Sequence, residues 1–173
     1  IINLPFNLGI GGAVQTGFKF AYENDYDVAV QLDGDGQHDP EYLEDIIMPI
    51  IQNETNVVIG SRFITKQGFQ STAYRRVGIQ FINFLLSVVT KRKFTDCTSG
   101  FRAYDKKAIK FLSEYYPKDY PEPESLVVLN KMGFKIVETP VIMKKRNGGK
   151  SSIRTLKVVY YMVKVSLAIL IDG

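Results

Sequence analysis

Four carboxylates follow an apolar stretch in the segment VAVQLDGDGQHDPEYL, residues 28–43. Asp33 and Asp35 are separated by a single glycine, and Gln37 follows two residues later. Carboxylate and amide oxygens are hard ligands that favour Mg²⁺ or Mn²⁺, and these ions usually take their remaining ligands from water and substrate phosphates. The spacing therefore predicts that Asp33, Asp35 and Gln37 form one half of a metal–diphosphate site.

Simpler interpretations apply to the same stretch. It could be a solvated turn in which Asp39 caps a helix, although four acids directly after a buried strand are more than such a turn requires. His38, the only histidine of the chain, could be a further metal ligand. A single histidine beside a helix start more often forms a structural hydrogen bond, and we expect this structural role for His38.

Strand-like and helix-like segments alternate along the chain, which predicts an α/β fold with a mostly parallel sheet flanked by helices. The strands are expected at residues 1–4, 27–32, 56–63 and 135–146, the last as one bent strand or a strand pair. The helices are expected at residues 9–24, 39–53, 71–90, 105–116 and 123–134, with a final helix from about residue 153. Ligands of such sheets bind at the carboxyl ends of strands, where the first two aspartates lie.

The composition of the 173 residues suits one domain with a buried core, because 45% of them are hydrophobic. The net charge of +4 permits contact with phosphates or an anionic membrane surface and proves neither. Cys97 is the only cysteine, which excludes an internal disulfide and fits a reducing compartment. The apolar runs at 77–89 and 158–171 are interrupted by polar residues and are shorter than the roughly 18 residues of a spanning helix. We expect a cytoplasmic protein, in solution or peripheral at the cytoplasmic face of the membrane.

Five segments, in order along nearly the whole chain, carry a resemblance to a known family. QLDGDGQHDPEYL resembles the Asp-x-Asp region of inverting family 2 glycosyltransferases. NLGIGGAVQTGF resembles their Asn-x-Gly-x-Gly-x-Ala helix start, and VVIGSRF resembles their Gly-Ser-Arg strand end. DCTSGFRAYDKKAI resembles their Asp-x-x-Ser-Gly-Phe-Arg segment, and NGGKSSI resembles the Gly-x-Ser loop before the last helix. Within the family, the chain most resembles the branch of dolichyl-phosphate mannose synthase and the bacterial undecaprenyl-phosphate glycosyltransferases.

The resemblance implies a GT-A-like fold, in which a nucleotide sugar binds to a Rossmann-like sheet. It implies a metal-dependent, inverting transfer of a sugar from a nucleoside-diphosphate sugar to a polyprenyl phosphate or glycan acceptor, in cell-wall or glycan biosynthesis. Family members normally begin with a Pro-x-x-Asn-Glu and an Asp-Asp-Gly-Ser strand end that hold the nucleobase and ribose, and neither motif occurs here. We therefore expect residues 1–173 to be a single catalytic domain that is truncated at its N-terminus.

The resemblance also assigns roles to individual residues. It makes Asp33 and Asp35 catalytic through the metal, and it places Gly11 at the donor-binding helix start. It places Arg62 and Arg102 near phosphates of the donor or of the acceptor lipid. Arginine suits such a role because its planar fork binds phosphate oxygens in pairs. For each arginine the simpler interpretation is a salt bridge.

Acidic residues elsewhere are candidates for a catalytic base. The resemblance places Asp96 in the active site, and it places Glu122 and Glu124 at a helix start where many family members carry an acidic pair. A base is needed only if the nucleophile carries a proton. A sugar hydroxyl would therefore need Asp96 or Glu124, and an ionised lipid phosphate would not. The basic, glycine-containing stretch KKRNGGKSS predicts a loop that closes over the diphosphate through Arg146 and Lys150.

Two other classes of function remain open on the sequence. A nucleotide-sugar pyrophosphorylase, which is a nucleotidyltransferase, shares the general fold but needs a glycine-rich triphosphate loop at its start. A non-catalytic, membrane-associated binding domain would retain the fold without a working metal site. The stretch GIGGAVQTG lacks the G-x-G-x-x-G spacing of a dinucleotide site, and no nucleic-acid partner is expected. Metal-dependent binding of a nucleoside diphosphate would separate the transferase from the binding domain.

Overall fold

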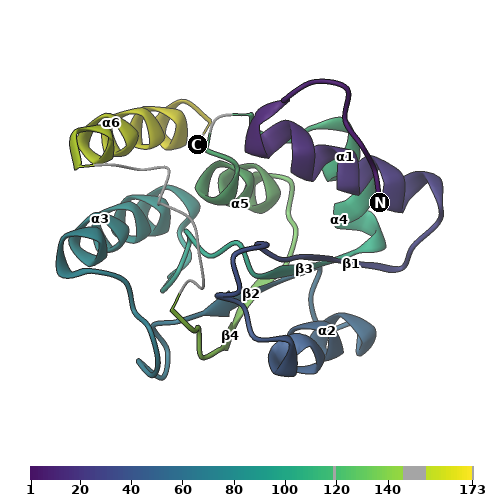
Figure 1. Ribbon diagram of the computed structural model, residues 1–173, viewed down its shortest axis with the longest axis horizontal. Helices are drawn as coiled ribbons and strands as arrows, with labels where there is room; N and C mark the ends of the chain where they lie inside the picture. Colours follow the sequence, from purple (N-terminus) through teal and green to yellow (C-terminus); the bar gives the residue numbers. More distant parts are fainter. Residues whose placement is uncertain (119, 146–154, 173) are drawn as a thin grey trace.

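The computed structural model describes residues 1–118, 120–145 and 155–172, and in the last helix it describes the side chains of residues 162–170. Four strands form the sheet: β1 (Val28–Gln31), β2 (Val57–Ser61), β3 (Arg102–Asp105) and β4 (Ile136–Pro140). The helices are α1 (Gly9–Glu23), α2 (Leu43–Ile51), α3 (Ala73–Thr90), α4 (Lys106–Glu114), α5 (Pro121–Lys131) and α6 (Thr155–Asp172), with a short 3-10 helix, η1 (Pro40–Tyr42), before α2. α2 covers one face of the sheet, and α1, α4 and α5 cover the other (Figure 1). The predicted α/β class is confirmed.

The order of the strands across the sheet is β1-β3-β2-β4. β3 pairs antiparallel with β1 and with β2, whereas β2 and β4 pair in parallel. Three strands therefore point in one direction, but the sheet is mixed, and the prediction of mostly parallel pairing is corrected on this point. The reversal follows from the connection. Residues 91–101 return from the end of α3 to the carboxyl end of β2, where Arg102 pairs with Ile59 and β3 runs back.

The predicted strand at residues 1–4 is wrong. The structure assigns no helix or strand to residues 1–8, and Ile1, Ile2 and Phe6 are exposed. An apolar run becomes a strand only where a neighbour satisfies its backbone hydrogen-bonding groups. The stretch from residue 135 forms one strand, β4, followed by an isolated bridge between Gly68 and Met143. The other predicted strands and helices are present within a few residues of their predicted bounds.

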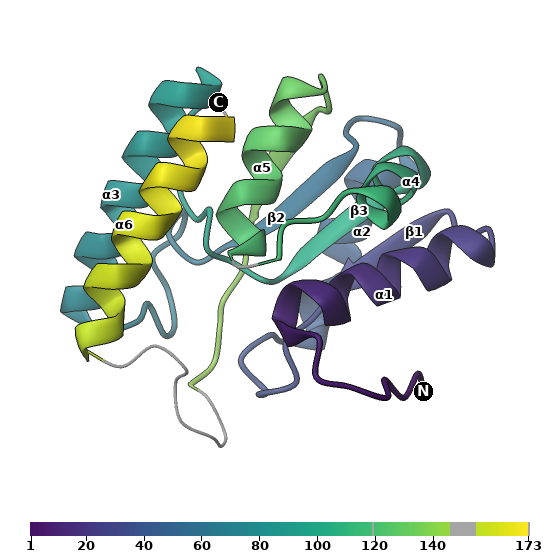
Figure 2. The same cartoon turned by 90° about the horizontal axis from the view of Figure 1, so that it is seen from above.

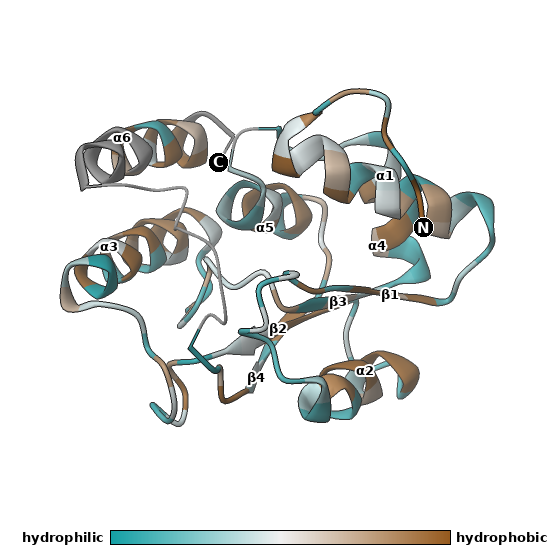
Figure 3. Ribbon diagram, viewed as in Figure 1, coloured by the Kyte–Doolittle hydropathy of each residue, from teal (hydrophilic) through white to brown (hydrophobic). Residues whose placement is uncertain are grey.

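Two apolar clusters pack on opposite faces of the sheet, because side chains alternate along each strand. Along β2, Val57 and Ile59 join the cluster on the face covered by α1, α4 and α5, whereas Val58 joins Ile46 and Ile50 of α2. Every residue of β2 is buried, and each fully buried aliphatic side chain stabilises the fold by about 1.5–3 kcal/mol. Figure 3 shows apolar residues along the central strands and on α2. The carboxyl end of β2 is therefore held in a packed core.

α3 and α6 lie side by side at one end of the molecule (Figures 1 and 2). Gly78 permits their close approach, since a Cβ on this residue would lie 3.3 Å from Sδ of Met162. Val165 and Ile169 of α6 are buried in the main core cluster. Of the helices in the described part of the chain, none combines the length and the apolarity that crossing a membrane requires.

Candidate active site

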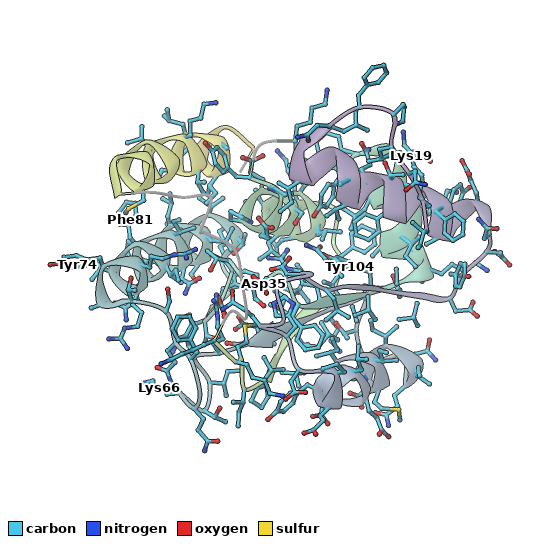
Figure 4. All side chains as sticks on the ribbon, in the orientation of Figure 1. Lys19, Asp35, Lys66, Tyr74, Phe81 and Tyr104 are labelled. Carbon is cyan, nitrogen blue, oxygen red and sulfur yellow. The ribbon has the colours of Figure 1, made fainter. Side chains whose placement is uncertain are left out.

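Three chain segments meet at one edge of the sheet. Residues 32–39 follow the carboxyl end of β1, residues 62–63 follow that of β2, and residues 94–101 lead into β3. Because β3 runs opposite to both neighbours, its amino end lies beside their carboxyl ends. Figure 4 shows Asp35 at this edge, close to the middle of the view. The site predicted after β1 therefore gains side chains from two further segments.

The acidic turn, residues 33–37, is folded by its own side chains and glycines. Oδ1 of Asp35 accepts a hydrogen bond from the backbone N–H of Gln37 at 3.0 Å. Gly36 has a φ of 76°, a backbone conformation that favours glycine. A tight turn therefore follows β1, and the backbone N–H of Gln37 holds the carboxylate of Asp35 within it.

Lys144, in the segment after β4, bonds to the end of the acidic turn and to Asp39 beyond it. Its N–H donates to the carbonyl of Gln37 at 2.9 Å, and Nε2 of Gln37 donates to the carbonyl of Lys144 at 3.4 Å. Nζ of Lys144 lies 2.6 Å from Oδ2 of Asp39, and this hydrogen bond is the largest cause that lowers the pKa of Asp39. Asp39 caps η1, as predicted, by accepting from the N–H of Glu41.

His38 has the structural role that we expected. The residue is 8% exposed, and its ring stacks on that of Phe101 at a centroid distance of 5.0 Å. Nδ1 accepts a hydrogen bond from the N–H of Asp33 at 3.1 Å, so the proton of the neutral ring is on Nε2, which lies 3.8 Å from Oδ2 of Asp33. Burial lowers the pKa of His38 and outweighs the opposing charge of Asp33. The imidazole therefore stays neutral and orients the start of the turn.

Asp33 lies over Gly100. A Cβ on Gly100 would lie 3.0 Å from Oδ2 and 3.1 Å from Oδ1 of Asp33, so the glycine leaves room for the carboxylate. The side chain of Asp33 is 43% exposed and stays open to a ligand. Among the described residues, no group of three or more His, Cys, Asp and Glu side chains could hold a metal ion alone. Asp33 and Asp35 with the amide of Gln37 fit Mg²⁺ or Mn²⁺ as a partial shell that phosphate or water completes.

Arg62 and Asp96 form a buried, bidentate ion pair. Nε and Nη2 of Arg62 lie 2.7 Å from Oδ2 and Oδ1 of Asp96, and the N–H of Arg62 donates to Oδ2 at 3.2 Å. The side chain of Asp96 is fully buried, and that of Arg62 is 13% exposed. Burial alone would lower the pKa of Arg62, but the hydrogen bond and the charge of Asp96, with smaller contributions from Cys97 and Asp33, together raise that pKa. Arg62 is therefore a fixed cation, and both oxygens of Asp96 are bound, which argues against Asp96 as a base.

Side chains of α3 and β4 hold the segment that carries Asp96. Asn83 donates to the carbonyl of Thr95 at 2.6 Å and accepts from the N–H of Cys97 at 2.9 Å. Glu138 accepts from the N–H groups of Thr95 and Asp96, each at 2.8 Å, and from the hydroxyl of Thr95 at 2.9 Å. Neither Asn83 nor Glu138 was predicted from the sequence as part of the site. The signal for Glu138 was an acidic residue inside the apolar strand IVETPV.

Arg102 is fully buried, and its guanidinium binds acceptors inside the protein. Nε donates to the carbonyl of Ser99, and Nη2 donates to that of Cys97, each at 2.7 Å. Nη1 donates to the carbonyl of Glu122 at 2.8 Å and to Oγ of Ser125 at 3.2 Å. These bonds tie residues 97–99 to α5. The geometry disagrees with the predicted contact between Arg102 and a phosphate, and it favours a positioning role.

The acidic pair at the start of α5 lies in a buried environment. Glu124, one of the two candidate bases for a sugar hydroxyl acceptor, is 8% exposed. Burial raises the pKa of Glu122, Arg102 lowers it, and repulsion by Asp33 raises it again. Burial is therefore the main influence on the carboxyl of Glu122.

Gly11 packs against the chain instead of facing open space. A Cβ on Gly11 would lie 2.5 Å and 2.6 Å from the carbonyl oxygens of Pro117 and Lys118. This glycine is required for the close approach of α1 to that segment, a role that differs from the predicted donor contact. Arg146 and Lys150, predicted to bind the diphosphate, lie outside the described residues.

A groove of about 710 Å³ lies between α3 and residues 63–70 and 93–95. It reaches the site through Thr95, and it has no carboxylate among its described lining residues. A second pocket of about 650 Å³ shares two side chains with it and adds two lysines. The groove combines cations with aromatic apolar surface, which suits an amphiphile with an anionic head. Its lining includes Lys66, Arg76, Lys93, Phe63, Phe84 and Phe94.

Residues 1–112 match the protein family described as Glycosyl transferase family 2. A UDP-N-acetylglucosamine–dolichyl-phosphate N-acetylglucosaminyltransferase of Methanococcus voltae is 38% identical over 141 residues, which are 78% of this chain and 55% of that protein. An undecaprenyl-phosphate mannosyltransferase of Micrococcus luteus is 30% identical over 149 residues, 84% of this chain and 60% of that protein. A polyprenol monophosphomannose synthase of Mycolicibacterium smegmatis is 29% identical over 167 residues, 91% of this chain and 61% of that protein. The chain therefore spans less than two thirds of each of these relatives.

Proposed function

The chain belongs to glycosyl transferase family 2, and from that premise we propose that it transfers a sugar from a nucleoside-diphosphate sugar to a polyprenyl phosphate. The mixed four-stranded sheet flanked by helices agrees with the GT-A-like fold of the family. The observation that carries the proposal is the convergence of Asp33, Asp35 and the fixed cation Arg62 at one sheet edge. The relatives supply the acceptor class, because their names include dolichyl phosphate, undecaprenyl phosphate or polyprenol.

Asp33, Asp35 and the amide of Gln37 would hold a Mg²⁺ or Mn²⁺ ion together with the donor diphosphate. When bound, such an ion stabilises negative charge on the leaving diphosphate as a Lewis acid. The hydrogen bond between Asp35 and Gln37 orders the turn, and His38 orients the backbone of Asp33. The ligand set therefore needs little rearrangement when the ion binds.

Arg62 serves the donor side of the site in this proposal. Its side-chain bonds to Asp96 use Nε and Nη2, so the pair leaves Nη1 for a phosphate oxygen. Groups that are fixed before the substrate arrives stabilise developing charge without reorganisation. Arg62 would neutralise part of the charge of the diphosphate in this way.

The acceptor phosphate would bind in the groove beside α3. Lys66, Arg76 and Lys93 offer cations to the phosphate, and the aromatic residues offer apolar surface to the first isoprene units. An ionised phosphate carries no proton that must be removed, so this reaction needs no base. That agrees with the engagement of both Asp96 oxygens by Arg62. The phosphate oxygen would attack the anomeric carbon opposite the diphosphate and invert it.

Two apolar stripes on the outer surfaces of α3 and α6 support contact with a membrane surface. Figure 4 shows Tyr74 pointing outward from α3. A helix that combines an apolar face with basic neighbours lies in the plane of a membrane interface, and each Lys or Arg near an anionic surface contributes roughly 1 kcal/mol. Such contact would bring the groove to its lipid substrate. The exposed residues of the stripes repeat every three or four positions: Tyr74, Val77, Phe81, Phe84 and Val88 on α3, and Val163, Leu167 and Leu170 on α6.

The proposal is tested by incubating the protein with labelled nucleotide sugars and undecaprenyl phosphate in detergent, with Mn²⁺ or with a chelator. We expect label in the lipid phase only when the metal is present. NMR of the anomeric proton in the product reports whether the configuration is inverted. Label on soluble glycans alone would exclude the polyprenyl phosphate acceptor, and label in the presence of chelator would exclude the metal.

A matched pair of lysine variants tests the groove. Lys66 lines it, whereas Lys19 is exposed on α1, on the other side of the molecule (Figure 4). We expect Lys66→Ala to raise KM for undecaprenyl phosphate, with donor KM unchanged, and Lys19→Ala to change neither. Equal acceptor KM in both variants would move the acceptor away from this groove.

A further inference from the structure

Glu138, on β4, carries a carboxylate that has no role in the proposed sugar transfer. Oε1 accepts from the N–H of Asp96 at 2.8 Å, and Oε2 accepts from the N–H and the hydroxyl of Thr95 at 2.8 Å and 2.9 Å. Within the described residues, Glu138 belongs to no ion pair. Three uncharged donors therefore hold its charge, and all three come from the segment that carries Asp96.

A glutamate at this position of β4 is energetically unfavourable unless its carboxylate is hydrogen-bonded. Glu138 pairs with Ile59 of the buried strand β2, and burial raises the pKa of its carboxyl, against the effect of the hydrogen bonds from Asp96 and Thr95. A carboxylate removed from water destabilises a fold unless its hydrogen bonds compensate. Residues that break the local apolar pattern are expected where function requires them. The groups that donate hydrogen bonds to Glu138 all belong to Thr95 and Asp96, so Glu138 positions this segment.

A short chain of contacts leads from Glu138 to Arg62. Glu138 fixes the backbone N–H groups of Thr95 and Asp96. The carboxylate of Asp96 then holds Nε and Nη2 of Arg62 at 2.7 Å. Nη2 of Arg62 also donates to Oγ1 of Thr98 in the same segment at 3.1 Å. The direction of the guanidinium therefore depends on the backbone that Glu138 holds.

We propose that Glu138 is a positioning residue that acts through Thr95 and Asp96 to aim Arg62 at an anionic ligand. The identity of that ligand, a nucleoside diphosphate, rests on the proposed function. The coupling between Glu138 and Arg62 does not rest on it, because it is a property of the hydrogen bonds. Glu138 touches no substrate in this scheme and differs from a catalytic residue in that respect.

The test compares Glu138→Gln with wild type in two measurements. The variant keeps the size of the side chain, but its NH₂ group would face an N–H or hydroxyl donor. We expect faster hydrogen exchange at the Asp96 amide and at Nε–H of Arg62, read by NMR. We also expect binding of UDP and of GDP with Mn²⁺, measured by calorimetry, to weaken by about tenfold to a hundredfold, the range for losing a supporting hydrogen bond behind a ligand site. Glu54→Gln, at an exposed glutamate before β2, is the control and should match wild type.

A double-mutant cycle with Arg62→Lys separates positioning from a general loss of structure. If Glu138 acts through Arg62, then adding Glu138→Gln to Arg62→Lys weakens nucleotide binding no further. An equal loss in both backgrounds, or wild-type exchange at Nε–H of Arg62 in Glu138→Gln, would overturn the inference. If Glu138→Gln does not fold, Thr95→Val removes one of the three hydrogen bonds together with the bond between the hydroxyls of Thr95 and Ser61. It should give the same signature at smaller amplitude, and Ser61→Ala, which removes the second bond without the first, is its control. Failure of the wild type to bind either nucleotide would count against the proposed function, while the Arg62 signal would still decide the coupling.

Discussion

The acidic turn, residues 33–37, and the segment 94–100 lie at the same sheet edge and treat their aspartates in opposite ways. The side chain of Asp33 is 43% exposed, whereas that of Asp96 is fully buried and binds Arg62 through both oxygens. A carboxylate with its oxygens already bound stabilises the fold, and one that faces solvent can bind a ligand. Position at this sheet edge therefore does not decide the role of an aspartate, and its hydrogen-bond and ion-pair partners do.

The two arginines repeat this contrast. Arg102 donates from all three of its nitrogens to acceptors inside the protein and has no exposed surface. Arg62 engages a single carboxylate through two nitrogens and keeps some exposure. Only Arg62 combines a fixed position with a surface that a phosphate could reach. The segment 94–100 is thus the frame of the candidate site, and we propose that the acidic turn is its ligand-binding part.

Replacing Asp96 by Asn should have the largest effect of these substitutions. It should lower the free energy of unfolding, because it removes the ion pair that joins the frame to Arg62. Arg62 would keep its charge in a nearly buried place without its partner. Removing one member of a buried ion pair costs about 3–5 kcal/mol, and urea unfolding would measure this loss. Asp27→Asn is the control, since the Asp27 side chain is 90% exposed and such surface pairs contribute about 0–1 kcal/mol. Equal stability of Asp96→Asn and Asp27→Asn would show that the buried ion pair of the frame stabilises the fold no more than a surface pair does.

Replacing Asp35 by Asn should spare stability and damage binding. The amide oxygen of Asn can still accept the N–H of Gln37, so we expect the turn to persist and the free energy of unfolding to change little. The lost charge should weaken Mn²⁺-dependent binding of a nucleoside diphosphate by about tenfold or more. Calorimetry with and without Mn²⁺ measures this effect. Unchanged binding in Asp35→Asn would show that the turn does not hold the metal.

The acidic turn could be predicted from the sequence because its determinants are local. Asp35, Gly36 and Gln37 form it within three positions, and the cap at Asp39 is equally local. The alternation of apolar and amphipathic segments is also local, so most helices and strands were located correctly. Residues 1–4 were the exception, since an apolar run has no strand geometry without a partner.

The frame could not be predicted, because its bonds join residues far apart in the chain. Arg62 and Asp96 are 34 positions apart, and Thr95 and Glu138 are 43 apart. Residue type indicates what Arg102 is able to bind and does not indicate which acceptors surround it. The direction of β3 is also determined by contacts between distant segments, since it depends on where residues 91–101 return to the sheet.

Replacing Gly100 by Ala tests the contact between the frame and the turn. The new Cβ would lie 3.0 Å from Oδ2 of Asp33, and the partly exposed carboxylate can move away. We therefore expect a few-fold loss of Mn²⁺-dependent nucleotide binding, about 1 kcal/mol or less, with little change in unfolding. Gly34→Ala is the matched control, because a Cβ on Gly34 would meet nothing within 4 Å. Equal binding in both variants would mean that the position of Asp33 over Gly100 is unimportant.

Replacing Lys144 by Ala should have the smallest effect, because it removes an exposed tie of the turn and leaves the backbone tie to Gln37 intact. The hydrogen bond from Lys144 lowers the pKa of Asp39 in the folded protein. A carboxyl with a lowered pKa stabilises the fold above its ordinary pKa, and this contribution is lost as the pH falls through the lowered value. Lys144→Ala should therefore be less stable than wild type at about pH 7, and the difference should vanish in acid below the lowered pKa, where Asp39 is protonated in both. Added salt should shrink the difference at neutral pH, since it screens exposed charges. Urea midpoints of wild type, Lys144→Ala and the control Lys145→Ala measure it. A difference that persists in acid would show that Lys144 supports the turn by packing and not by charge.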